Sequence, residues 1–222
     1  MIEEFQSKLN TLQDSIKNNK EQVRLLIVTK SQEVKKIKYL VDLNCKMFGE
    51  NYVEEGIEKI KQIQQTDLEW HFIGKIQSNK IKKIVEYFDW IQTLSSEKHA
   101  IIIDKECEKL SKTMNVCIQI NIDNEETKGG IKLSDLEPFY KKISLLKNIK
   151  IKGLMAIPKK LNTLKESSNS YSILRAKFNA YKHLNNDFDT LSIGMTNDFE
   201  VAIKYGSNMI RMGTYFFGDR TK

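Results

Sequence analysis

The sequence predicts one α/β domain over residues 1–222, a (β/α)₈ or TIM barrel with an extra N-terminal helix. Three observations predict it. The length of 222 residues and the 40% share of hydrophobic residues suit a single domain with a sizeable core. Eight short apolar runs recur along the chain, and helical patterns lie between them. Eight strands that alternate with helices are typical of a closed parallel barrel.

The apolar runs predict the strands of this barrel. Most runs are continuously apolar instead of alternating, so both faces of each strand should be covered, as in a parallel sheet. The eight runs lie at residues 25–29, 47–51, 70–74, 90–94, 116–122, 151–157, 190–195 and 209–217. An open, doubly wound sheet is the alternative, because a strand count from sequence alone is fallible.

Spacings of three and four between apolar residues predict the helices. Residues 2–16 form one amphipathic helix, with Ile2, Phe5, Leu9, Leu12 and Ile16 on its apolar face. Ser134 and Glu137 have the spacing of a capping box, and the apolar face continues through Phe139, Ile143 and Leu146. Ser168 is expected to start a further helix with Tyr171, Leu174, Phe178 and Tyr181 on one face. Residues 158–170 are expected to form a long, mobile loop.

Composition argues against several classes of protein. The apolar runs are far shorter than the roughly 20 residues of a membrane span, and the acidic start resembles no secretory signal, so we expect a cytoplasmic protein. Three cysteines without a Cys-x-x-Cys pair and three scattered histidines fit neither a disulfide framework nor a metal site. The net charge of +7 comes from lysines interleaved with glutamates, which indicates solvated helix faces and no nucleic-acid partner.

Polar residues at the ends of the runs are the candidate site, because barrel chemistry gathers at the carboxyl ends of the strands. Lys30 closes the first run, where a partly desolvated ammonium becomes a nucleophilic amine more easily. The simpler alternative is a lysine that extends to solvent. Asn51 closes the second run. His71, Asn79 and Asn121 are weaker candidates, each with a plain structural alternative: a hydrogen-bonded core histidine, a helix start and a buried amide.

The last two runs indicate an anion site. Gly194, Met195 and Thr196 follow the seventh run, and Gly213 and Thr214 follow the eighth, the two loops that often bind phosphate in barrels. Asp198 is the awkward member, because its carboxylate repels phosphate unless it caps the following helix from outside. Arg211 lies within the apolar eighth run and needs an acceptor, either a structural carboxylate or a bound cofactor.

Together these residues put an amine, a phosphate cradle and an arginine on one rim. That set suits pyridoxal 5′-phosphate (PLP), whose aldehyde, phosphate and pyridine nitrogen need three such partners.

From about residue 5 to residue 220, the chain resembles the pyridoxal phosphate homeostasis proteins, the YggS/PROSC family. Four segments carry the resemblance: Phe48-Gly49-Glu50-Asn51-Tyr52-Val53, Trp70-His71-Phe72-Ile73-Gly74 with Gln77-Ser78-Asn79-Lys80, Gly153-Leu154-Met155-Ala156-Ile157-Pro158, and Leu191-Ser192-Ile193-Gly194-Met195-Thr196 with Ile210-Arg211-Met212-Gly213-Thr214. A set of this kind in this order is highly specific.

The resemblance implies a fold-type III PLP barrel, like the N-terminal domain of alanine racemase, with a Schiff base on Lys30. It also implies that Arg211 lies near the pyridine nitrogen and Asn51 near the ring hydroxyl. The implied phosphate contacts are Ser192, Gly194, Met195, Thr196, Gly213 and Thr214. Two departures stand out. The family's usual Lys-Thr-x-Pro is Lys30-Ser31-Gln32-Glu33 here, without the proline, and its usual serine in the seventh-strand motif is Thr196.

The resemblance favours a PLP carrier over an enzyme. Racemases of this fold take a second acid/base from a C-terminal domain, and none is expected here because the sequence ends at Lys222. An arginine at the pyridine nitrogen would also disfavour its protonation. We therefore expect a monomer that supplies PLP, with apo PLP-dependent enzymes as partners and no membrane partner. The alternatives are a weak PLP-dependent racemase or lyase, and an aldolase-like barrel that uses Lys30 on a phosphorylated sugar.

Overall fold

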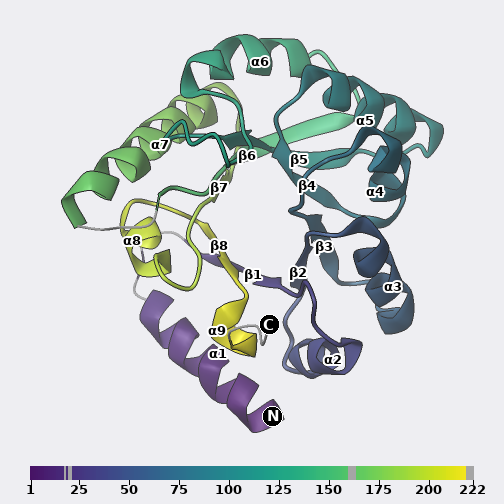
Figure 1. Cartoon of the computed structure of the whole chain (residues 1–222), viewed down its shortest axis with the longest axis vertical. Helices are drawn as coiled ribbons and strands as arrows, with labels where there is room; N and C mark the ends of the chain where they lie inside the picture. Colours follow the sequence, from purple (N-terminus) through teal and green to yellow (C-terminus); the bar gives the residue numbers. More distant parts are fainter. Residues whose placement is uncertain (18, 20–21, 160–163, 219–222) are drawn as a thin grey trace.

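The computed structural model describes residues 1–17, 19, 22–159 and 164–218, and it forms a closed barrel of parallel strands ringed by helices (Figure 1). The strands are β1 (Arg24–Val28), β2 (Met47–Glu50), β3 (Glu69–Phe72), β4 (Trp90–Leu94), β5 (Met114–Ile120), β6 (Ile149–Ala156), β7 (Thr190–Ser192) and β8 (Met209–Met212). Each strand pairs with the next in the chain, and β8 pairs with β1 to close the ring. The closed barrel is confirmed, and the open sheet is wrong.

Helices cover the outside of the strands, as the uninterrupted apolar runs predict. They are α1 (Ile2–Ile16), α2 (Val34–Asp42), α3 (Val53–Ile63), α4 (Ile81–Tyr87), α5 (Glu97–Lys109), α6 (Leu136–Ile143), α7 (Leu164–Leu184), α8 (Phe199–Lys204) and α9 (Thr214–Phe217), with 3₁₀ turns at η1 (Ser78–Lys80) and η2 (Leu133–Asp135). The extra N-terminal helix is confirmed as α1, which buries Phe5, Leu9 and Leu12. Phe5 packs edge-on against Phe216 and Phe217 of α9, so α1 supports the segment after β8.

The seventh and eighth strands end well short of the predicted runs. The eighth run leaves the sheet after Met212, and beyond Gly213 it becomes α9. The seventh run ends at Ser192 because Gly194 adopts a left-handed backbone with φ of 100°. A Cβ at Gly194 would lie 2.7 Å from the Cβ of Ala202, so this position has room for glycine alone. Both shortened strands therefore deliver their loops to the rim of the barrel.

Three local predictions are wrong. Ser134 caps no helix: it lies in η2, its hydroxyl donates to Asp135 at 3.0 Å, and α6 begins at Leu136 without a side-chain cap. Ser168 starts no helix, because α7 begins at Leu164. Residues 164–170 of the predicted loop are therefore helical. Its residues 160–163 lie outside the described part of the chain.

None of the helices in the described part of the chain combines the length and the apolar character that crossing a bilayer requires.

Candidate functional site

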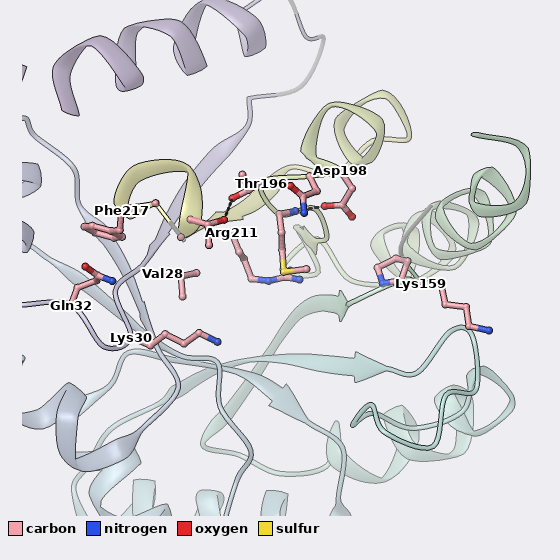
Figure 2. A pocket seen from close by; sticks show the side chains of 14 residues that line it. Val28, Lys30, Gln32, Lys159, Thr196, Asp198, Arg211 and Phe217 are labelled. Carbon is pink, nitrogen blue, oxygen red and sulfur yellow. Dashed lines mark hydrogen bonds between the residues drawn. The ribbon is translucent and has the colours of Figure 1, made fainter. Parts of the chain in front are cut away.

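A pocket of about 480 Å³ opens at the carboxyl ends of the strands, between the loops that follow β1, β6, β7 and β8. Six of the nine predicted site residues line it: Lys30, Met195, Thr196, Arg211, Gly213 and Thr214. In Figure 2 the side chains of Lys30 and Arg211 extend toward the same space from two sides. The lining also includes residues that the sequence reasoning missed: Val28, Gln32, Pro158, Lys159, Asn197, Phe217 and Gly218, besides Asp198.

Lys30 reaches the pocket because it follows the first strand directly and is only partly exposed. The backbone on both sides of it is held by hydrogen bonds. The Thr29 N–H donates to the Gly49 carbonyl at 3.0 Å, and the Ser31 N–H donates to Glu55 at 2.5 Å. Lys159 is the other lysine of the lining, and Figure 2 shows its ammonium pointing away from Lys30.

Two threonine hydroxyls form the wall opposite Lys30. The Thr214 hydroxyl donates to the Thr196 hydroxyl at 3.0 Å, which joins the loop after β8 to the loop after β7. The Tyr215 N–H donates to the same Thr196 oxygen at 3.2 Å. Hydroxyl groups and loop backbone on one wall form a surface suited to an anion such as phosphate.

Asp198 is turned away from that wall by two hydrogen bonds. One carboxylate oxygen accepts from the Met195 N–H at 2.6 Å, and the other accepts from the Tyr171 hydroxyl at 2.5 Å. Burial and the neighbouring Asp198 carboxylate raise the pKa of Tyr171, so its hydroxyl stays protonated and keeps donating. The carboxylate thus braces the 195–198 turn, and both of its oxygens are occupied by these donors. It does not cap α8 with its side chain, which was the arrangement that the sequence analysis required of an acid beside a phosphate.

Arg211 is almost fully buried, with 4% of its surface exposed. Its guanidinium donates hydrogen bonds to oxygen atoms of the barrel. Nη1 donates to the Ser192 carbonyl at 2.7 Å and to the Ser192 hydroxyl at 2.9 Å, and Nη2 donates to the Ala156 carbonyl at 3.0 Å. Burial lowers the pKa of Arg211 to about 10, so it stays charged at neutral pH. Over the described chain no carboxylate forms a salt bridge with it, so the structural ion pair considered from the sequence is not found.

The guanidinium begins a chain of hydrogen bonds that crosses the barrel interior. The Ser192 hydroxyl, which accepts from Arg211, donates to Gln92 Oε1 at 2.7 Å. Gln92 Nε2 lies 2.8 Å from His71 Nδ1, and His71 Nε2 lies 2.7 Å from Glu69. The amide nitrogen of Gln92 can only donate, so His71 Nδ1 accepts and His71 Nε2–H donates to the Glu69 carboxylate. Each group in this series therefore has a hydrogen-bond partner, and every bond is donated in the direction from Arg211 toward Glu69.

The sequence left two roles open for His71, a site residue or a hydrogen-bonded core histidine, and the structure shows the hydrogen-bonded core histidine. It is fully buried and stacks on Trp90 with ring centroids 5.0 Å apart. Burial lowers its pKa, so it is neutral at pH 7. The two amides considered beside it are structural as well. Asn79 is exposed in η1, and Asn121 bonds the backbone of Glu125 on both of its amide atoms.

Three predicted residues, Ser192, Gly194 and Asn51, do not line the pocket. The Ser192 side chain is fully buried and bonded within the barrel, and Gly194 lies beneath the loop, where its carbonyl accepts from the Arg211 N–H at 3.0 Å. The side-chain oxygen of Asn51 is buried and has no hydrogen-bond partner among the described residues. An unpaired buried acceptor costs free energy, so this atom is suited to receive a hydrogen bond from a ligand.

The important residues missed from sequence had only a weak signal. Gln92 is a polar residue within an apolar strand, which is a reason to look for a buried partner. Glu55 and Lys59 hydrogen-bond to the backbone beside Lys30. They are four residues apart on a helix, a spacing that usually indicates an exposed ion pair.

The barrel, the lysine after its first strand and the anion-suited wall after its last two strands define a class of cofactor-binding barrels. The chain matches the family model of the alanine racemase N-terminal domain over residues 2–221 and belongs to that family.

Within it, the chain belongs to the pyridoxal phosphate homeostasis proteins. It is 41% identical to the protein of that name from Buchnera aphidicola over 201 residues, covering 90% of this chain and 88% of the relative. It is also 40% identical to the Haemophilus influenzae protein of the same name, and the match covers 97% of this chain and 93% of that relative.

Solved structures agree. The structure of PipY of Synechococcus elongatus with PLP bound has a TM-score of 0.85 and 29% sequence identity to this chain. The match covers 96% of this chain and 100% of the PipY chain. An alanine racemase of Clostridium difficile shares the fold, with a TM-score of 0.76 at 16% identity, and the chain covers 58% of it.

Proposed function

We propose that this protein binds PLP as a Schiff base on Lys30 and serves intracellular PLP homeostasis and amino-acid balance as a carrier in the cytoplasm. The observation that carries the proposal is the meeting of the Lys30 amine, the Thr196 and Thr214 hydroxyls and the Arg211 guanidinium around one pocket. Relatives named for PLP homeostasis and the PLP-bound PipY support it. When bound, PLP supplies an aldehyde that condenses with a primary amine.

The residues fit the groups of PLP. Thr196 and Thr214, with the backbone of Gly213, would hold the phosphate between the loops after β7 and β8. The Met195 N–H already donates to Asp198, and Gly194 does not line the pocket, so the phosphate contacts implied for these two residues would require the 194–198 turn to rearrange. Arg211 would donate to the pyridine nitrogen. The buried, unpaired oxygen of Asn51 would accept from the ring hydroxyl.

The Ser192 hydroxyl already has two hydrogen-bond partners within the barrel. It donates to Gln92 and accepts from Arg211, which supports a role in holding Arg211. The phosphate contact implied by the family resemblance would require this hydroxyl to leave Gln92.

Two features favour a carrier over an enzyme. A guanidinium that donates to the pyridine nitrogen keeps that nitrogen unprotonated, which weakens the withdrawal of electrons from a bound amino acid. Asp198 is the single carboxylate among the described lining residues, and its oxygens are bonded to Met195 and Tyr171. A general base must reach the substrate proton, and this acid is turned away. We propose a monomer whose partners are apo PLP-dependent enzymes.

Borohydride trapping tests the covalent bond. The protein is incubated with PLP, reduced, digested and analysed by mass spectrometry, and we expect the pyridoxyl group on Lys30. Lys159→Ala is the matched control, because Lys159 also lines the pocket and its loss should leave the adduct unchanged. An adduct that survives in Lys30→Arg, or that lies mainly on Lys159, contradicts the proposal.

A further inference from the structure

A buried cluster of charged side chains lies behind Lys30, formed by Glu50 at the end of β2 and by Glu55 and Lys59 on α3. Lys59 is 4% exposed. Its ammonium donates to Glu50 at 2.7 Å, to Glu55 at 2.5 Å and to the Thr29 carbonyl at 2.6 Å, which uses all three of its N–H groups. A buried ion pair is often no more stable than apolar side chains of the same volume. Stability alone therefore does not account for this cluster.

The cluster binds both peptide groups that adjoin Lys30. The Thr29 carbonyl belongs to the peptide before Lys30 and accepts from Lys59. The Ser31 N–H belongs to the peptide after Lys30 and donates to Glu55 at 2.5 Å. Peptide groups are planar, so fixing both planes fixes φ and ψ of Lys30 and the direction in which its side chain leaves the backbone. Glu50 also accepts from the Thr29 hydroxyl at 2.6 Å, which helps to hold the residue that precedes Lys30.

Local backbone features fit this arrangement. Ser31 has φ of 61°, a left-handed conformation that costs free energy in a residue other than glycine, and its N–H bond to Glu55 helps to hold it there. Gly56 lets α3 come close to β2, because a Cβ at this position would lie 2.7 Å from the Phe88 ring and 3.2 Å from Glu50 Cβ. Lys59 lies on the same face of α3, one turn further along. Its ammonium is thereby brought within reach of the first strand.

We propose that Glu55 and Lys59 are positioning residues for Lys30: they orient its backbone so that the amine enters the pocket in the direction required to capture an aldehyde. The inference rests on the proposed function, which gives Lys30 that task. The segment after Lys30 lacks the proline that is usual in the family, and the bond between Glu55 and the Ser31 N–H restrains it instead. Correct orientation of a reacting group speeds a reaction, and a displacement of about 1 Å can cost a hundredfold.

The test compares the rates at which variants capture PLP. Protein freed of PLP with hydroxylamine is mixed with PLP, quenched with borohydride at intervals, and the adduct on Lys30 is measured by mass spectrometry. Glu55→Ala should slow capture about tenfold or more, because the Ser31 N–H loses its acceptor. Glu55→Gln keeps an oxygen in place and should restore most of the rate. Glu54→Ala is the control: this neighbouring glutamate is exposed, pairs with Lys80 and Lys83, and should leave the rate unchanged.

A failure of the inference and a failure of the proposed function give different results in this test. Rates are compared at a temperature well below the unfolding transition of every variant, so that a loss of stability does not imitate a loss of positioning. Lys59→Met should also slow capture, because the Thr29 carbonyl loses its donor. Should this variant fail to fold, Glu55→Ala still decides, because Glu55 is partly exposed. Capture by Glu55→Ala at the wild-type rate overturns the inference and leaves the proposed function standing. A wild-type protein that forms no adduct on Lys30 overturns both.

Discussion

Replacing Gln92 with leucine tests the hydrogen-bond chain that supports Arg211. Gln92 is fully buried, accepts from Ser192 at 2.7 Å and donates to His71 at 2.8 Å. Leucine keeps most of the volume but leaves the Ser192 hydroxyl and His71 Nδ1 without these partners. Each orphaned buried group costs about 1–3 kcal/mol, so Gln92→Leu should lower the free energy of unfolding by about 2–6 kcal/mol.

Urea unfolding followed by circular dichroism measures this loss, provided that both proteins unfold in one transition of similar slope. Gln119→Leu is the matched control, because Gln119 is also buried in a strand but makes one side-chain bond, to the Gly129 carbonyl at 3.0 Å. It should lose about 1 kcal/mol, the typical net value of one hydrogen bond. If Gln92→Leu loses no more than Gln119→Leu, the interpretation of the chain as a connected, satisfied network is wrong.

Three further predictions follow from the same geometry. Ser192→Ala should weaken the binding of PLP and of phosphate-free pyridoxal equally in equilibrium titrations, because Ser192 acts through Arg211; a loss confined to PLP would support a phosphate contact instead. The wild-type free energy of unfolding should fall below pH 6.5 by up to about 1.4 kcal/mol per pH unit, since burial lowers the pKa of His71 and the unfolded chain binds the proton first; in His71→Asn this slope should shrink, and an identical slope would contradict the prediction. Burial raises the thiol pKa of Cys45 and Cys107 to about 11 and that of Cys117 to about 12, so iodoacetamide at pH 8 should label the folded protein slowly and all three thiols in urea, as counted by mass spectrometry; rapid labelling of the folded protein would refute it.

Much of the barrel could be predicted from the sequence, because its strands are local patterns. Each of the eight apolar runs overlaps one strand of the structure. Boundaries were less accurate. The strands of the seventh and eighth runs stop at Ser192 and Met212, and Ser134 hydrogen-bonds to Asp135 instead of capping α6. These errors arise because several conformations of a short segment differ by little free energy, and tertiary contacts select one of them.

The sequence pattern alone indicated which strand ends surround the pocket. The carboxyl ends of parallel strands share one face, so Lys30 and the loops after β7 and β8 had to meet once the barrel closed. The side chains that support these residues follow from the three-dimensional packing. Gln92 and Ser192 are 100 positions apart in the chain, and Lys59 approaches the first strand from a helix, so no local pattern records either contact. Such contacts depend on barrel register and helix packing, which set side-chain directions that a sequence pattern leaves open.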